Sequence, residues 1–86
     1  MAAYRVIIPR TVQKALGRIH PDMQRRIRAR LLALAENPRP PGVVKLGGPD
    51  ELYRVRIGTY RALYTIEDRV LLVLVVRVAH RGEAYE

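Results

Sequence analysis

Three arginines in two short segments could together bind an anion. Arg54, Arg56 and Arg61 stand in stretches with strand-like alternation of apolar and polar residues. Because side chains alternate between the two faces of a strand, Arg54 and Arg56 should share one face. Gly58 and Thr59 fit a two-residue hairpin turn with glycine first, and this turn sets Arg56 directly opposite Arg61.

This arrangement of like charges favours a binding surface. Two cations facing each other across a sheet cost roughly 0.2–1 kcal/mol of stability. The planar, permanently charged guanidinium group is well suited to phosphate. The alternative is that these residues are solvated surface arginines. The expected opposition of Arg56 and Arg61 favours a functional role for these two, whereas Arg54 and Arg81 leave both interpretations open.

The composition is typical of a nucleic-acid-binding protein. The chain of 86 residues has 16 basic and 8 acidic side chains, a net charge of +8, and a pI near 10.8. Such a charge on a small domain is the electrostatic signature of nucleic-acid binding. Fourteen of the basic residues are arginine, although a basic surface would also suit an acidic protein partner.

Several classes of protein are disfavoured by the same composition. The chain has no cysteine, and its two histidines, His20 and His80, stand far apart without carboxylates at ligand spacing. We therefore expect neither a metal nor a cofactor. The longest apolar run, 70–76, is too short to cross a membrane, and no signal sequence precedes the first strand-like segment. These features predict a cytoplasmic protein.

Hydrophobic periodicity predicts a single α+β domain over residues 1–86, with the order β-α-α-β-β-β-β. The expected elements are a strand at 4–8, helices at 12–19 (with Thr11 as N-cap) and 21–36, and strands at 43–46, 52–57, 60–66 and 70–76. The second helix is amphipathic, with a cationic side formed by Arg25, Arg26, Arg28 and Arg30.

We expect the helices to form an antiparallel hairpin on one face of a mainly antiparallel sheet. The last four strands should form a meander, and the first strand should join the middle of the sheet beside the last strand. The continuous apolar run at 70–76 predicts that this last strand is central and covered on both faces.

Motifs on these elements resemble the RelE/ParE family of bacterial toxins. They are Lys45-Leu46, Tyr53-Arg-Val-Arg56, Gly58-Thr-Tyr-Arg61, Tyr64 and Val78-Ala-His-Arg81, followed by Tyr85. The resemblance extends over essentially the whole chain. It implies a RelE-like fold related to microbial ribonucleases, and a toxin that a cognate antitoxin neutralises. RelE-branch members cut mRNA in the ribosomal A site, whereas ParE-branch members inhibit DNA gyrase.

The resemblance also implies roles for individual residues. The RelE-like pattern has basic residues at Arg54 and Arg56, arginines at Arg61 and Arg81, and a tyrosine at Tyr85. The best-known pattern has lysines at the first two positions, and arginine, unlike lysine, does not readily act as a base. We therefore assign the four arginines to phosphate binding and transition-state stabilisation. Tyr85 could donate a proton or stack on a base.

Two further residues are candidates. Lys45 is expected to contact the RNA backbone, the alternative being that it contacts only solvent. His80 is a candidate acid or base, since histidine readily exchanges protons near neutral pH, although it could instead make a local structural hydrogen bond. A two-residue turn at 68–69 would put His80 on the arginine face. A three-residue turn would put Arg77 and Arg81 on that face instead. A bulge in the strand would exchange the two faces again.

The sequence therefore predicts a metal-independent, ribosome-dependent mRNA endoribonuclease toxin that uses an arginine-rich sheet face. Its expected partners are a cognate antitoxin, the ribosome and mRNA. Two alternatives stay open: a ParE-like gyrase inhibitor that cuts nothing itself, and a weakly active member of the family that still binds RNA.

Overall fold

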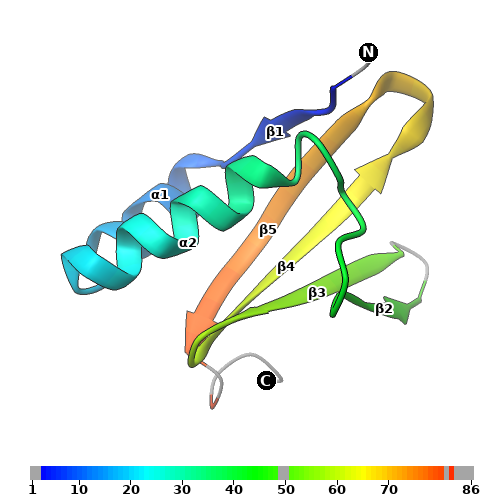
Figure 1. Ribbon diagram of the computed structural model, residues 1–86. Helices are drawn as coiled ribbons and strands as arrows, with labels where there is room; N and C mark the ends of the chain where they lie inside the picture. The colour runs from blue at the N-terminus through cyan, green and yellow to red at the C-terminus, as the bar shows by residue number, and fades with distance from the viewer. Residues whose placement is uncertain (1–2, 49–50, 81, 83–86) are drawn as a thin grey trace.

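A two-helix hairpin packs against one face of a twisted five-stranded sheet in the computed structural model, which describes residues 3–48, 51–80 and 82 (Figure 1). The elements are β1 (Arg5–Ile7), α1 (Arg10–Gly17), α2 (Pro21–Ala33), β2 (Val44–Gly47), β3 (Leu52–Ile57), β4 (Tyr60–Glu67), the 3-10 turn η1 (Asp68–Val70) and β5 (Leu72–His80). The α+β class and the expected order of elements are confirmed.

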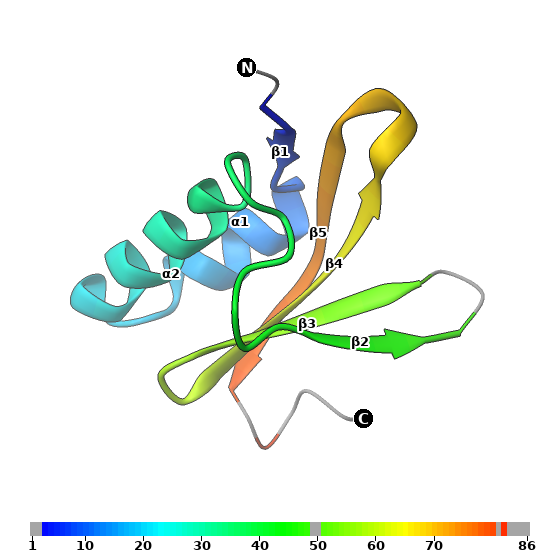
Figure 2. The ribbon, with the colours of Figure 1, turned by 45° about the vertical axis from the view of Figure 1, so that its right-hand side comes forward.

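The strand order across the sheet is β1-β5-β4-β3-β2. Strand β1 pairs with β5 in parallel, and the other pairs are antiparallel, so the expected meander is confirmed. The place of β1 beside β5 is also confirmed. Its expected position in the middle of the sheet was wrong: β1 forms an edge, because β4 already occupies the other side of β5 (Figure 2).

The helices bury one face of the sheet. Leu16, Ile27 and Leu31 from the helices are fully buried in the core. The sheet contributes buried residues that include Val55, Ile57, Ala62, Tyr64, Val73 and Val75.

The other face is not covered by any described element, and we call it the open face. Its outward residues on β3, β4 and β5 include Arg54, Arg56, Arg61, Leu63, Thr65, Leu74, Val76 and Arg77. Leu74 is 37% exposed and Val76 48%. The expectation that the last strand is covered on both faces was therefore wrong, because the helices cover one side of β5 only.

Both helices depart slightly from the expected ends. The N-cap of α1 is Pro9 rather than Thr11, and it makes no side-chain cap hydrogen bond. Helix α2 begins at Pro21, whose fixed φ suits the first helical turn, and ends at Ala33 rather than near Glu36. Residues 34–36 continue as turns closed by i to i−3 hydrogen bonds.

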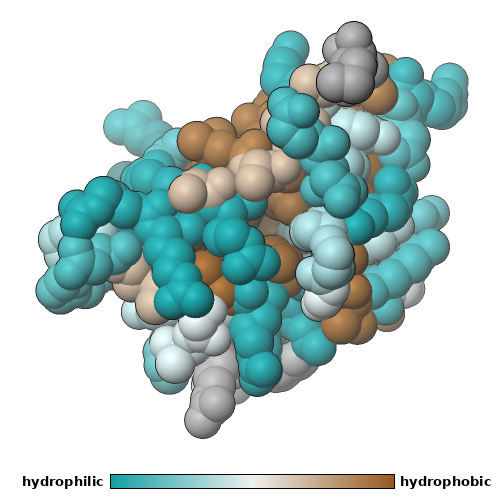
Figure 3. Space-filling view, in the orientation of Figure 1, coloured by the Kyte–Doolittle hydropathy of each residue, from teal (hydrophilic) through white to brown (hydrophobic). Residues whose placement is uncertain are grey.

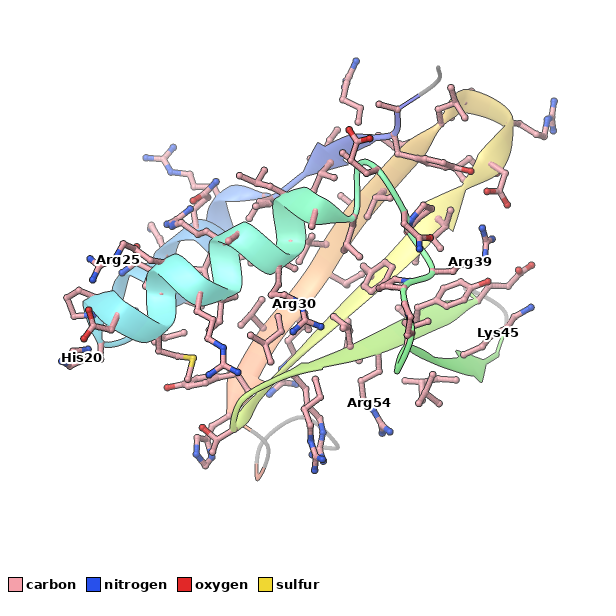
Figure 4. The ribbon with its side chains drawn as sticks, viewed as in Figure 1. His20, Arg25, Arg30, Arg39, Lys45 and Arg54 are labelled. Atoms are coloured by element: carbon pink, nitrogen blue, oxygen red, sulfur yellow. The ribbon has the colours of Figure 1, made fainter. Side chains whose placement is uncertain are left out.

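The cationic side of α2 faces solvent, as expected. Hydrophilic side chains cover the end of the helical hairpin near the turn between α1 and α2 (Figure 3). His20 and Arg25 lie at this turn (Figure 4). Arg25 forms an ion pair with Asp22, and the Arg28 guanidinium donates to Gln13 Oε1 at 2.7 Å.

The hairpin turn between β3 and β4 requires its glycine. Gly58 has φ +62°, and a Cβ placed there would lie 2.9 Å from the Met23 Cε of α2. We expect Gly58→Ala to lower the free energy of unfolding by about 1–2 kcal/mol, because a residue with a Cβ is strained in this conformation. Urea unfolding measures this change. Gly17→Ala is the matched control, since a Cβ at Gly17 meets nothing within 4 Å. Equal stability of the two variants would contradict the prediction.

A charged cluster holds the loop after α2 against the end of the sheet. The Arg39 guanidinium donates to Asp68 Oδ1 and Oδ2 at 3.2 and 2.9 Å, and the Tyr4 hydroxyl donates to Oδ1 at 2.6 Å. Arg39 Nε also donates to the Tyr53 hydroxyl at 3.2 Å. These bonds connect the residue before β1, the loop after α2 and the turn between β4 and β5.

The cluster makes the stability of the fold depend on pH. Hydrogen bonds from Arg39 and Tyr4 lower the pKa of Asp68 below its ordinary value. A carboxyl group with a lower pKa in the folded chain stabilises the fold above its unfolded pKa, and this contribution is lost as the pH falls through the folded pKa. We expect the urea midpoint to fall below about pH 4, and to fall less in Asp68→Asn.

The matched control for this prediction is Glu36→Gln. Glu36 is exposed and forms no ion pair within the described ranges, so this variant should keep the pH profile of the wild type. An Asp68→Asn profile that matches the wild type over the same pH range would refute the proposed role of the cluster.

Candidate nucleic-acid interface

The arginine pair expected from the sequence is confirmed. The register of β3 and β4 sets Arg56 opposite Arg61, and that of β4 and β5 sets Arg61 opposite Ala79. Arg56 is exposed, whereas Arg61 is half-buried and its Nε atom is fully buried. Because packing restricts the Arg61 stem, its guanidinium group loses less conformational entropy on binding an anion.

Arg54 and Arg77 form a second row on the open face, with Leu63 between them. Leu63 of β4 pairs with Arg54 on one side and with Arg77 on the other. Arg54 and Leu63 are half-buried and Arg77 is exposed. Arg54 extends from β3 on the side away from the helices (Figure 4). The open face thus carries four arginines in two neighbouring rows.

A bulge at Val76 decides which residues of β5 join the arginines. Four residues, 68–71, connect β4 to β5, rather than the expected two or three. With regular pairing along β5, a connection with an even number of residues would place His80 on the arginine face. The extra residue Val76 reverses the faces of the residues that follow it, so Arg77 lies on the arginine side. From the sequence, Arg77 was expected on the arginine face only if the turn before the last strand had three residues. The one feature that drew attention to Arg77 was a cation directly after the apolar run at 70–76.

His80 lies apart from the two arginine rows. It pairs with Tyr60 across the sheet, and the two rings meet edge to face with centroids 5.4 Å apart. Tyr60 in turn pairs with Ile57, which is fully buried beneath the helices. His80 therefore belongs to the helix side of the sheet, and its acid–base role stays a prediction.

Lys45 also lies on the other side of the sheet from the arginines. It pairs with Tyr53, whose side chain is buried beneath the helices, and its Nζ lies 3.9 Å from Glu51 Oε1. Figure 4 shows Lys45 and Arg54 pointing in different directions from neighbouring strands. The structure does not bring Lys45 to the arginine rows, and its contact with RNA stays a prediction. Arg81 and Tyr85 lie outside the described residues.

The half of the open face that lies farthest from the Gly58 turn differs in charge from the half that carries the arginines. A hollow of about 740 Å³ lies there, and its lining residues are Glu51, Leu52, Thr65, Ile66, Glu67, Asp68, Arg69, Leu74 and Val76. The face therefore changes from cationic near the Gly58 turn to apolar and acidic near the turn at Asp68. A bound polyanion would favour the cationic half.

Within the described ranges no group of three or more His, Asp and Glu residues is placed to hold a metal ion. None of the helices described is long and apolar enough to cross a membrane.

Comparison with known proteins identifies the family. Residues 6–85 match the profile of a family described as the ParE toxin of type II toxin–antitoxin system, parDE. The chain belongs to this toxin family. It is also 31% identical, over 88 residues, to the candidate toxin RelE1 of Methanocaldococcus jannaschii, with 96% of each chain covered.

Solved structures show that this toxin is RelE-like. It resembles a chain of the archaeal RelE–RelB complex from Pyrococcus horikoshii OT3 with a TM-score of 0.84 and 33% identity, over 95% of the toxin and 99% of that chain. A chain of the RelBE2 toxin–antitoxin complex from Mycobacterium tuberculosis gives a TM-score of 0.78 and 27% identity, over 92% and 99%. The resemblance to RelE/ParE toxins that the motifs indicated is confirmed.

Proposed function

We propose that this toxin is a metal-independent endoribonuclease that cuts mRNA on the ribosome. The observation that carries the proposal is the pairing of Arg56 with Arg61 on the open face, one row away from Arg54. A compact group of guanidinium side chains suits the phosphodiester that is cut.

The chemistry assigns these arginines to the charge that develops on the phosphate. In metal-free cleavage the 2′-oxygen bonds to the phosphorus as its proton passes to a base, the bond from phosphorus to the 5′-oxygen breaks, and the 5′-oxygen takes up a proton. Arg54, Arg56 and Arg61 would stabilise the negative charge of the transition state. Arg81 and Tyr85 are proposed to supply a further cation and the proton for the leaving oxygen.

The residues of the two rows support the proposed dependence on the ribosome. In the part of the chain that the structure describes, these rows contain only arginine, leucine and alanine. None of these side chains readily accepts the proton of a 2′-hydroxyl at neutral pH. An enzyme built in this way would gain most of its rate from correct alignment of the RNA, which the ribosome would provide.

We further propose a cognate antitoxin as the protein partner, with an acidic or amphipathic segment. The similar solved structures include the archaeal RelE–RelB complex and the toxin–antitoxin complex RelBE2. The net charge of +8 suits a partner with acidic residues.

The test is cleavage of a defined mRNA in a purified translation system. Toxin, programmed ribosomes and mRNA are combined, and the new 5′ ends are mapped by primer extension. We expect cuts that require the ribosome and that are suppressed by the cognate antitoxin. Intact mRNA at saturating toxin would reject the proposal.

A second candidate is inhibition of DNA gyrase, because the matching family profile is described as that of ParE toxins. A gyrase supercoiling assay with the same preparation separates the two functions. Inhibition of supercoiling without mRNA cleavage would favour the second candidate.

A further inference from the structure

We infer that Arg54, Leu63 and Arg77 form a second phosphate subsite, next to the one that holds the scissile phosphate. The inference rests on the proposed function and adds to it a residue, Arg77, and a binding length of two phosphates. The family motifs do not include Arg77, and the proposed cleavage chemistry gives Arg77 no role.

Arg77 and Arg54 lie on either side of one residue. Both pair with Leu63, so their backbones are two strand spacings apart, or about 9.6 Å. Two arginine side chains at this separation can reach a single phosphate from opposite sides. Leu63 between them is half-buried and presents an apolar surface that suits a ribose or a base.

The distance between the two rows matches the spacing of phosphates along a nucleic-acid strand. Arg54 and Arg56 are two residues apart on β3, as Leu63 and Arg61 are on β4. Two residues along an antiparallel strand span about 6.8 Å. This distance is close to the separation of successive phosphates in an extended single strand. A strand of RNA that runs along β4 would therefore place one phosphate over each row.

No cation follows the second row at the next positions outward on β3, β4 and β5, which are Leu52, Thr65 and Leu74. These residues line the hollow together with three carboxylates and one cation, Glu51, Glu67, Asp68 and Arg69. The excess of negative charge there would repel a third phosphate. The arrangement therefore predicts a site for two phosphates, or three nucleotides.

The bulge at Val76 gives this subsite its second arginine. With regular pairing Arg77 would turn toward the helices, and the bulge instead directs it to the open face. β-Bulges commonly redirect a side chain in this way near functional sites. Arg77 is exposed, whereas Val75 and Val78 of the same strand are buried in the core.

The experiment compares two uncleavable ligands on the isolated toxin. One is a deoxytrinucleotide with two phosphates, and the other is a deoxydinucleotide with one. Binding is followed at several salt concentrations by NMR, with the Leu63 methyl signals as the local reporter. The variants are Arg77→Gln and Arg61→Gln, with Arg18→Gln as the control, because Arg18 is exposed at the end of α1 on the helix side.

We expect Arg77→Gln to weaken trinucleotide binding about tenfold and to leave dinucleotide binding nearly unchanged. The slope of log K against log salt should fall by about 0.7 for the trinucleotide, the value for one phosphate contact on a single strand. Arg77→Lys should retain most of this slope, since it keeps the charge. Arg54→Gln should weaken binding of the trinucleotide more than that of the dinucleotide, because Arg54 is proposed to contribute to both phosphate sites; this second variant keeps the test valid if Arg77→Gln folds poorly.

The outcomes separate this inference from the proposed function. Equal loss for both ligands in Arg77→Gln, or no loss for either, would overturn the second subsite. If Arg61→Gln still weakened both ligands, the first row would stand. If Arg61→Gln matched Arg18→Gln, the phosphate site itself would be wrong, and the second subsite with it.

Discussion

Replacement of Arg61 by alanine should reduce ribosome-dependent mRNA cleavage by about 10²–10³-fold, the usual effect of removing one group that stabilises transition-state charge. Arg61 is central to the proposed site, because it faces Arg56 and its stem is packed into the surface of the sheet. Its guanidinium group is therefore positioned before the RNA binds. Initial rates of cleavage at saturating mRNA-programmed ribosomes measure the effect.

Arg61→Lys should have an intermediate rate, because lysine keeps the charge and loses the planar fork. The fold should change little: removal of Arg61 relieves a like-charge pair worth roughly 0.2–1 kcal/mol, which offsets the lost packing of its stem. Arg18→Ala is the control and should cleave at the wild-type rate. An Arg61→Ala toxin that cleaves as fast as the wild type would refute the proposed role of the arginine rows.

Tyr64→Ala should lower the free energy of unfolding by about 3–5 kcal/mol, the largest effect on stability that we expect from a single residue. Tyr64 is completely buried, and its ring stacks on Tyr53 with centroids 5.8 Å apart. Its hydroxyl donates to the Pro38 carbonyl oxygen at 2.8 Å. Burial raises the pKa of Tyr64 to about 12, so the hydroxyl keeps its proton and remains a donor at alkaline pH as well. For a chain of this size, thermal unfolding should occur more than about 10 °C lower.

Tyr64→Phe separates the hydrogen bond from the packing. This variant keeps the ring and should lose only about 1 kcal/mol, the usual net contribution of a single hydrogen bond. Thermal unfolding followed by circular dichroism compares both variants with the wild type. Equal losses in the two variants would show that the ring contributes little. That result would contradict the prediction that the buried ring of Tyr64 contributes most of the lost stability.

Local patterns in the sequence predicted the arginine pair correctly. Alternation along two strands and a glycine-first turn determine that Arg56 faces Arg61, and both rules act over a few residues. Helical periodicity and Pro21 likewise predicted the helical hairpin. The motifs around these residues indicated the toxin family, which the comparisons confirm.

The tertiary structure decided what depends on distant residues. The face of Arg77 depends on both the four-residue connection before β5 and the bulge at Val76, and a change of one residue in either would reverse it. The ion pair of Arg39 with Asp68 joins residues 29 positions apart, and only packing of the loop onto the sheet brings them together. Turn chemistry and alternation act between near neighbours, whereas register errors add up along a strand and long-range contacts depend on the whole fold.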